Sequence, residues 1–428
     1  MTKTKNVKRL VVFALIAILA VSALVAVFAG CQDTETFKVG VLHINPTNST
    51  SGYTHAHQQG IEYAKAQLGL SNAQFLYKDS LSDTDNNAIG AAIQELIDAG
   101  CKMIIGTSFG YQDQMLVYAK RYPNIIFSHG TGYLNTMGEG LENNMNNYFG
   151  RIYQVRYLSG IAAGMKTSTG KLGYVCAQGT AVAECTSGVN AFTLGAQAAW
   201  EYRKSIDSNI SGDISVDVRI LNSWYDPANE TAFANALLDA GCDVITQHCD
   251  TENPSTAAKT AGKYSIGYNS DMGVAVKNAG EERNASVLTS VVWNWGVYYK
   301  AAIEAAKKCF DNDGNLTDKA AWIEFGHYYG SFADGLYKLA DFSTEVNADT
   351  KAMIAAVETI MSDDANLANW DVFSGKVIKF TKNTNGSFSI AFEEQALLKA
   401  DGTPAGEVTV DNIKGDMPYW VKGVIARA

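Results

Sequence analysis

Positive charge is scarce in this chain beyond its first 30 residues. The 428 residues contain 34 Lys and Arg against 44 Asp and Glu. Four of the basic residues and none of the acidic ones lie within residues 1–30, so the remainder carries 30 against 44 and a net charge of -14. No cluster of Lys or Arg occurs after residue 31. This balance argues against a nucleic acid or an anionic membrane surface as partner.

The signatures of common hydrolases and nucleotide-binding enzymes are also missing. There is no Gly-x-Ser-x-Gly nucleophile elbow and no His-Glu-x-x-His zinc motif. The segment Gly106–Gly110 has glycines but lacks the Lys of a phosphate-binding loop. One enzymatic alternative stays open, in which Asp226 and Asp271 act as an acid/base pair in a nucleoside hydrolase.

Neither cysteine nor histidine spacing indicates a metal or a cofactor. The chain has seven Cys but no Cys-x-x-Cys pair, and its six His are scattered. Cys101 and Cys242 both follow the phrase Asp-Ala-Gly at the start of an apolar run, which favours small buried hydrophobes. Cys176 and Cys185 are close enough in sequence to bridge a loop, and the bridged and free forms both stay open.

The first 31 residues resemble the signal of a bacterial lipoprotein. A basic start precedes the apolar run Leu10–Phe28 and then Ala29-Gly30-Cys31. In such signals the chain is cut before the cysteine, which is acylated, so residues 1–30 are read as signal peptide and Cys31 as the lipidation site. Phe28 stands where Leu is usual, and the alternative is an uncleaved membrane anchor. Both interpretations hold the rest of the chain at the cell membrane, outside the cytoplasm.

Strand and helix signals alternate along the chain in two successive series. The first runs from a buried strand at 37–44 to a strand at 125–127, and the second from a helix at 156–166 to a strand at 264–268. A hydrophobic content of 47% in a chain of this length provides for two packed lobes. We therefore predict an α/β fold of two doubly wound parallel-sheet lobes, with a ligand cleft between them at the strands' carboxyl ends.

The two series also predict how the chain divides. Residues 31–36 form a short lipid-anchored tether. One lobe takes 37–152 plus about 291–325, and the other takes 153–290 plus part of 326–428. No low-complexity linker separates the lobes, so we expect the chain to cross between them by short strands near 147–151, 286–292 and 322–328.

Aromatic and acidic residues follow nearly every predicted strand. Aromatic faces with a few directed polar groups suit a flat polar ring, because stacking contributes about 1–3 kcal/mol per base and carboxylates accept hydrogen bonds from ring N–H groups or sugar hydroxyls. The alternative for any single ring is a place in the core between elements. The candidate ligand-binding residues are Tyr53, Thr54, Ser108, Phe109, Phe192, Trp224, Asp226, Asp250, Thr251, Asp271 and Trp293.

Several segments together resemble the basic membrane protein (BMP) family of substrate-binding lipoproteins. The matching phrases are Gly52–Gly60, Gly106–Tyr111, Phe127–Tyr133, Tyr148–Gly160, Ile220–Pro227, Ile266–Asp271 and Leu288–Gly296. The resemblance implies a type I periplasmic-binding-protein fold, a purine nucleoside or nucleobase as ligand, and an ABC permease as partner. It implies neither a cofactor nor an enzymatic activity.

The resemblance also suggests roles for particular residues. The two rings that hold the base in this family map to Tyr53 and Phe192, and the ribose-binding aspartate maps best to Asp226. Trp293 stands where nucleoside-binding members often carry Lys, so a free purine base is an alternative to a nucleoside. The runner-up function is a receptor for another small solute, such as a sugar or a signal, that feeds a sensor protein.

Overall fold

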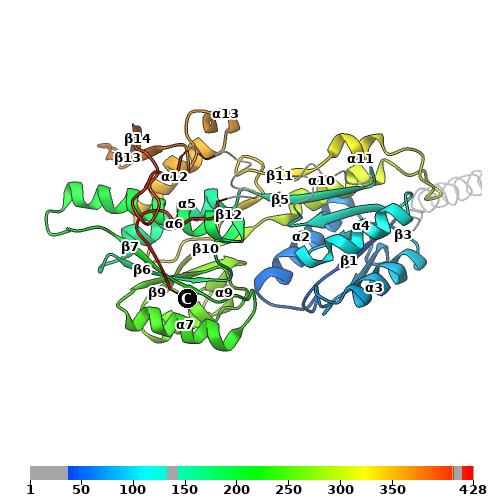
Figure 1. Cartoon of the computed structure of the whole chain (residues 1–428), viewed down its shortest axis with the longest axis horizontal. Coiled ribbons are helices and arrows are strands. Elements are labelled where there is room, and N and C mark those ends of the chain that lie inside the picture. The colour runs from blue at the N-terminus through cyan, green and yellow to red at the C-terminus, as the bar shows by residue number, and fades with distance from the viewer. Residues whose placement is uncertain (1–36, 133–142, 407, 409–416, 428) are drawn as a thin grey trace, which may run out of the picture.

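Two open sheets with flanking helices lie side by side along the long axis of the molecule (Figure 1). The computed structural model describes residues 37–132, 143–406, 408 and 417–427. The predicted signal peptide, the lipidation site Cys31 and the tether lie outside these residues. The predicted alternation of strand and helix is confirmed in both series.

The first lobe is built on a six-stranded sheet in which all strands are parallel. Its order is β2-β1-β3-β4-β5-β11, so the first five strands have the doubly wound order of a flavodoxin-like sheet. The strands are β1 (Lys38–Leu42), β2 (Phe75–Lys78), β3 (Cys101–Gly106), β4 (Ile126–Gly130), β5 (Met145–Gly150) and β11 (Tyr328–Gly330). The helices of this lobe are α2 (Gly52–Leu68), α3 (Asn86–Asp98), α4 (Gln112–Arg121), α10 (Trp295–Lys307) and α11 (Ala320–Phe325).

The second lobe repeats the same strand order in a seven-stranded sheet. Its order is β15-β7-β6-β8-β9-β10-β12, and only β12 is antiparallel to its neighbour. The strands are β6 (Lys171–Cys176), β7 (Ser215–Ile220), β8 (Val244–Gln247), β9 (Tyr264–Asn269), β10 (Val287–Trp293), β12 (Tyr337–Leu339) and β15 (Val424–Arg427). The helices are α5 (Tyr153–Lys166), α6 (Ala183–Ile206), α7 (Pro227–Asp239), α8 (Asn253–Thr260), α9 (Met272–Ala275), α12 (Ala348–Met361) and α13 (Asp364–Leu367).

The repeated phrase Asp-Ala-Gly-Cys makes the same turn in both lobes. It ends α3 and α7, and the glycines Gly100 and Gly241 have φ of 88° and 92°. Glycine adopts this left-handed conformation without the steric cost that a Cβ brings, and so ends each helix. Cys101 and Cys242 follow and are buried, which confirms their prediction as small core residues.

The chain passes between the two sheets three times. β5 leads into α5, β10 leads into α10, and β11 leads into β12. The first two crossings lie at 151–152 and at 294, next to the predicted 147–151 and 286–292. The third differs from the predicted 322–328, because β11 still pairs with β5 and the chain crosses after it, at 331–336. Short connections of this kind act as hinges between domains that close on a ligand.

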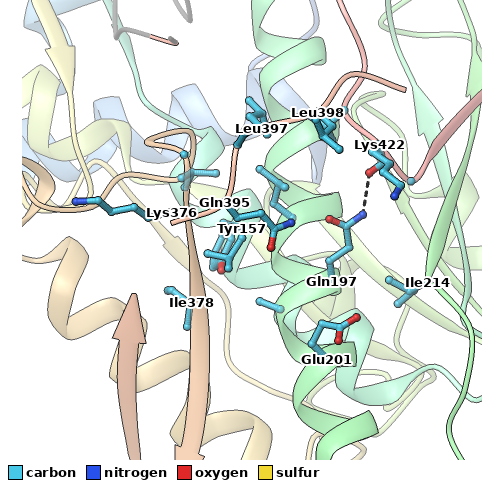
Figure 2. Close-up of a pocket in the computed structure, with 18 of the residues that line it drawn as sticks. Tyr157, Gln197, Glu201, Ile214, Lys376, Ile378, Gln395, Leu397, Leu398 and Lys422 are labelled. Atoms are coloured by element: carbon cyan, nitrogen blue, oxygen red, sulfur yellow. Dashed lines mark hydrogen bonds between the residues drawn. The ribbon is translucent and has the colours of Figure 1, made fainter. Parts of the chain in front are cut away.

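The C-terminal part of the chain packs on the second lobe. It includes the hairpin β13 (Lys376–Lys382) and β14 (Phe388–Glu394), whose connecting turn carries Asn383 and Gly386. A cavity of about 350 Å³ lies between α6, this hairpin and residues 395–398 (Figure 2). At its edge Gln197 Nε2 donates to the backbone oxygen of Lys422 at 2.8 Å, which ties the last segment to α6.

Candidate ligand-binding cleft

A cavity of about 890 Å³ opens between the two lobes, at the carboxyl ends of their strands. Asn45 and Ser108 line it after β1 and β3, and Gln178 and Asp250 line it after β6 and β8. In each sheet these are the two neighbouring strands at which the strand order reverses, which is where open α/β sheets bind their ligands. The volume suits a small molecule.

Aromatic side chains make up a third of the cavity wall. The ten that line it are Tyr53, Phe109, Tyr148, Phe149, Tyr153, Trp224, Tyr225, Tyr268, Tyr328 and Tyr329. Two of them, Phe109 of the first lobe and Tyr225 of the second, are 56% and 59% exposed. Rings that stay this exposed contribute little to the core. Both are therefore candidates for contact with a flat ligand in the cavity.

Among Asp, Glu, Lys, Arg and His, only acidic side chains line the described cavity wall. Asp83, Glu184 and Asp250 line it, and no Lys, Arg or His does so. Asp83 accepts a hydrogen bond from the Ser108 hydroxyl at 2.6 Å, and Glu184 accepts one from the Tyr268 hydroxyl. Carboxylates repel anions and accept hydrogen bonds from N–H and O–H groups. The wall therefore suits a neutral or cationic ligand that carries such donors.

Asp250 and Asn269 form a polar pair at the centre of the second lobe's wall. Asn269 Nδ2 donates to Asp250 Oδ1 at 2.8 Å, and both side chains are buried. Burial raises the pKa of Asp250 well above its usual range, and the nearby carboxylates of Glu230 and Glu184 raise it further. Asn269 Oδ1 is buried without a hydrogen-bond partner in the described structure, which leaves an acceptor for a ligand donor.

Backbone strain concentrates around the cavity. Four non-glycine residues in the described part of the chain have positive φ, and each ends or follows a strand: Ser80, Thr131, Asn222 and Asn269. Thr131 and Asn269 line the cavity directly. Such conformations cost of order 1–3 kcal/mol each and occur mainly where function requires them.

Tyr53 connects the cavity to the hinge through a column of stacked rings. Its hydroxyl donates to the backbone oxygen of Thr107, and burial raises its pKa well above the usual range, so the phenol is neutral. Its ring meets the edge of His57, which stacks on Trp295 at 4.5 Å between centroids. Trp295 in turn stacks on Trp293 at 4.3 Å, on the other side of the crossing at 294.

Hydrogen bonds join the lobes along one side of the cavity. Ser51 Oγ donates to Glu252 Oε2 at 2.9 Å, and the Gly52 N–H donates to Ser270 Oγ at 3.1 Å. Gly52 has φ of 79°, and a Cβ there would lie 2.3 Å from the backbone oxygen of Asp250. Only glycine lets α2 begin this close to the second lobe.

The structure brings together five of the eleven predicted ligand-binding residues. Tyr53, Ser108, Phe109, Trp224 and Asp250 all line the cavity. They come from both lobes and follow four different strands. Residues chosen because they follow strands thus lie on one common surface.

Phe192, Trp293 and Thr54 lie behind that surface instead. Phe192 is fully buried in α6, where its ring meets Tyr174 edge to face at 5.5 Å, because this side of the helix faces β6. Trp293 is also buried and donates from Nε1 to the hydroxyl of Tyr268, itself a wall residue, at 3.2 Å. Thr54 is buried within α2 and accepts a hydrogen bond from the Asn45 N–H. Trp293 can therefore position the wall without touching a ligand.

The three remaining candidates serve local structure. Asp226 and Asp271 accept hydrogen bonds from the first N–H groups of α7 and α9, and Asp271 also pairs with Arg283 at 3.1 Å. Thr251 donates to the buried carboxylate of Glu230. Neither aspartate lines the cavity, so the structure does not assemble the acid/base pair of the hydrolase alternative there.

Sequence reasoning missed several wall residues. Tyr225 and Asn269 lie in the phrases Ile220–Pro227 and Ile266–Asp271, of which only Trp224, Asp226 and Asp271 are predicted ligand-binding residues. Asp83 lies in a loop and Glu184 in the first turn of α6, and neither belongs to a distinctive motif. The positive φ of Asn269 would have marked it, but no sequence pattern reports that angle.

The described helices include none that combines the length and the apolarity needed to cross a bilayer. Among solved structures, an ABC transporter solute-binding protein from Aeropyrum pernix superposes with a TM-score of 0.57, at 14% identity over 81% of this chain and 94% of that one. The likeness confirms the predicted α/β class and the type I periplasmic-binding fold.

Relatives with a stated ligand include two of nearly full length. A purine-binding protein of Brucella abortus is 33% identical over 397 residues, which cover 91% of this chain and 93% of that protein. A Haloferax volcanii protein, provisionally named as the glucose-binding protein of an ABC transporter, is 29% identical over 84% of this chain and 81% of its own length. A family model described as "ABC transporter substrate-binding protein PnrA-like" matches residues 37–319. The chain therefore belongs to the Bmp family of PnrA-like ABC transporter substrate-binding proteins.

Proposed function

We propose that the cleft binds a purine nucleoside or a free purine base, which the chain delivers to an ABC permease. The observation that carries this proposal is a wall whose described residues include ten aromatic side chains and three carboxyl groups but no Lys, Arg or His. A purine is a flat neutral ring with N–H donors. The aromatic residues can stack on its faces, and the carboxyl groups can accept hydrogen bonds from its N–H groups. A nucleotide would place its phosphates among carboxylates, and we expect it to be rejected.

The two exposed rings supply the stacking in this proposal. Phe109 and Tyr225 belong to opposite lobes, so closing the lobes brings a ring to each face of the base. Asn269 and Asn147 line the cavity with amide groups, which donate and accept and thus match the mixed edge of a purine. Asp250 then takes a ring N–H or a sugar hydroxyl.

Lobe closure and membrane attachment complete the proposed function. Two lobes turn about the three crossings and present the closed form to the permease. Acylation of Cys31 keeps the receptor on the outer face of the membrane, since two acyl chains anchor stably where one does not. Replacing Cys31 with Ser should abolish the incorporation of labelled fatty acid into the chain, whereas Cys309→Ser should not.

A hexose is the second candidate ligand, because one full-length relative is named for glucose. Carboxylates and aromatic faces also suit sugar hydroxyls and sugar C–H surfaces. A hexose has no flat face for two rings to clamp, so it makes less use of Phe109 and Tyr225 than a purine does. The two ligands can be tested on the same protein.

The experiment uses the chain from residue 32 onward with inosine, guanosine, adenosine, their free bases and glucose. Thermal unfolding reports binding, since a ligand at 100 times its Kd adds about 2.7 kcal/mol to the stability of the folded state. Chromatography of the recovered ligand shows whether the glycosidic bond is intact. A shift with at least one purine and an intact bond supports the proposal. No shift with any purine refutes it, a shift with glucose alone favours the second candidate, and bond cleavage favours the hydrolase.

A further inference from the structure

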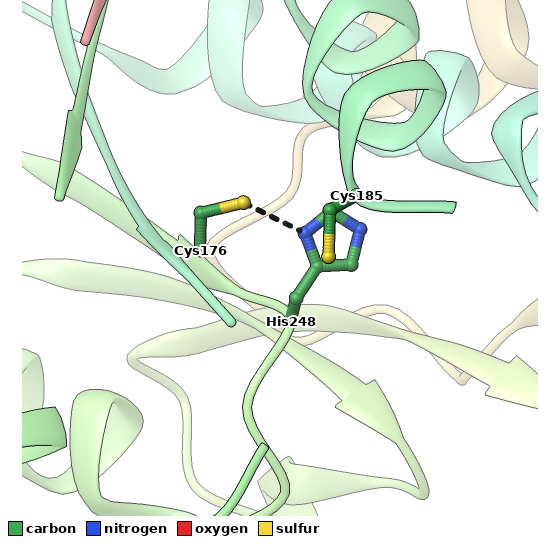
Figure 3. Close-up of side chains that lie close together, drawn as sticks. All are labelled: Cys176, Cys185 and His248. Atoms are coloured by element: carbon green, nitrogen blue, oxygen red, sulfur yellow. Dashed lines mark hydrogen bonds between the residues drawn. The ribbon is translucent and has the colours of Figure 1, made fainter. Parts of the chain in front are cut away.

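Three side chains of types that can ligate a metal, Cys176, Cys185 and His248, come together in the second lobe (Figure 3). Cys176 ends β6, Cys185 lies in the first turn of α6, and His248 directly follows β8. All three are fully buried, and their ligand atoms lie within 4.8 Å of one another. The convergence could not be predicted from spacing, because 63 residues separate Cys185 from His248.

The distances fit a thiolate–imidazole metal site. Cys176 Sγ lies 3.6 Å from His248 Nδ1. Metal–sulfur and metal–nitrogen bonds of about 2.3 Å and 2.0–2.1 Å place the two ligand atoms of a tetrahedral zinc site about 3.5–3.6 Å apart. An ion can therefore enter between these atoms with little movement of the pair.

The imidazole is oriented as a ligand would need. His248 Nε2 lies 3.2 Å from the hydroxyl of Tyr174, a hydrogen bond that occupies this nitrogen and leaves Nδ1 directed at Cys176. Metal-binding histidines are typically held in this way through their second nitrogen. Gly188, one turn beyond Cys185 on α6, makes room for the ring, since a Cβ there would lie 2.5 Å from Nε2.

We propose that Cys176, Cys185 and His248 bind a thiophilic d10 cation, Cu⁺ or Zn²⁺. Two thiolates and one imidazole are soft or borderline ligands that select these ions over Mg²⁺ or Ca²⁺. Three ligands suffice for Cu⁺. Zn²⁺ requires a fourth ligand. The backbone oxygen of Gln178, which accepts the Cys176 S–H at 3.0 Å, would have to move away from the sulfur to take that place. Binding forms two metal–sulfur bonds and releases the two thiol protons to solvent.

The ion would join the ends of a loop that forms part of the cleft. Residues 177–182 connect Cys176 to the start of α6, and both Gln178 of this loop and Glu184 in the first turn of α6 line the cavity. His248 stands two residues before Asp250, another wall residue. A bound metal thus fixes three strand and helix ends at the point where the second lobe meets its solute.

The test uses the full-length reduced chain, kept free of oxygen and of reductant. Zn²⁺ is titrated against a coloured zinc chelator and Cu⁺ against a coloured Cu⁺ chelator, and Co²⁺ is added to look for a thiolate-to-metal charge-transfer band. We expect one equivalent of Cu⁺ or Zn²⁺ to bind, a cobalt band, and a higher Tm with the ion. Loss of an outer partner of a metal ligand costs 10–100-fold in affinity, so Cys185→Ser should weaken binding by about 100-fold or more.

Cys309→Ser is the matched control, since Cys309 is equally buried, its thiol donates to the backbone oxygen of Ala305 at 3.4 Å, and it is not part of the cluster. It should bind the ion like the wild type. His248→Gln gives a second variant in case Cys185→Ser fails to fold, and circular dichroism checks both. Equal binding by Cys185→Ser, or no binding of either ion and no cobalt band in the reduced wild type, would overturn the proposal. The proposal would also fail if Cys176 and Cys185 form a disulfide and the protein binds neither ion after that disulfide is reduced. None of these readouts depends on which solute the cleft takes.

Discussion

Removing either exposed ring from the cleft should weaken purine binding without unfolding the protein. Stacking contributes about 1–3 kcal/mol per ring, and 1.4 kcal/mol is a factor of ten in Kd. Phe109→Ala and Tyr225→Ala should therefore each raise the Kd by about 5- to 150-fold, as measured by isothermal titration calorimetry. Because both side chains are more than half exposed, the free energy of unfolding should change by no more than about 0.5 kcal/mol.

Two control variants separate stacking from other effects. Tyr225→Phe keeps the ring and should keep most of the affinity. Phe392→Ala removes a ring that is 42% exposed on β14, outside the cleft, and should leave the Kd unchanged. If both Phe109→Ala and Tyr225→Ala bind the purine within twofold of the wild type, the ligand does not lie between these rings. If the wild type binds glucose but no purine, the ligand lacks the flat ring on which the predicted stacking depends.

Three further outcomes test the scaffold. Gly160→Ala places a Cβ 2.1 Å from the backbone oxygen of Phe192, so it should prevent close packing of α5 on α6 and abolish soluble expression. Asp226→Ala removes the N-cap that accepts the Asn229 N–H, and should cost about 1 kcal/mol in urea unfolding with no change in Kd. Burial lowers the pKa of His129 to about 4. As pH drops from about 6.5 to 4, His129 takes up a proton in the unfolded chain but not in the native one, so the free energy of unfolding falls. His129→Gln should make the free energy of unfolding depend less steeply on pH over this range.

Local patterns predicted the architecture because each element is specified by a few neighbouring residues. The turns at Gly100 and Gly241 show this directly, since the same four-residue phrase ends a helix and starts a strand in both lobes. The third crossing was misplaced because the pairing of β11 with β5 joins residues 180 apart, which no local window contains. The predicted family is confirmed by the matches over most of the chain.

The site was only partly predictable, because strand ends fix position but not direction. Tyr53 and Asp250 follow strands and face the cavity, whereas Phe192 sits on a helix whose inward side depends on β6. For Asp226 a capping role competed with the ligand-binding role. An Asp before Pro at the start of a helix is a capping signal, and in the structure Asp226 caps α7. The ligand role proposed for it by resemblance has no support from its position outside the cavity.

The interleaved lobes have a consequence for the export that the proposed signal peptide would direct. The first sheet is complete only when β11 has joined β5, long after β5 itself has been synthesised, and the second needs β12 and β15. Contacts between residues so distant in sequence slow folding, because the entropy of closing the long loop is lost before they form. An export channel that threads unfolded chains gains time from such a delay. The same three crossings that let the lobes close on a solute would thus keep a newly made chain transportable.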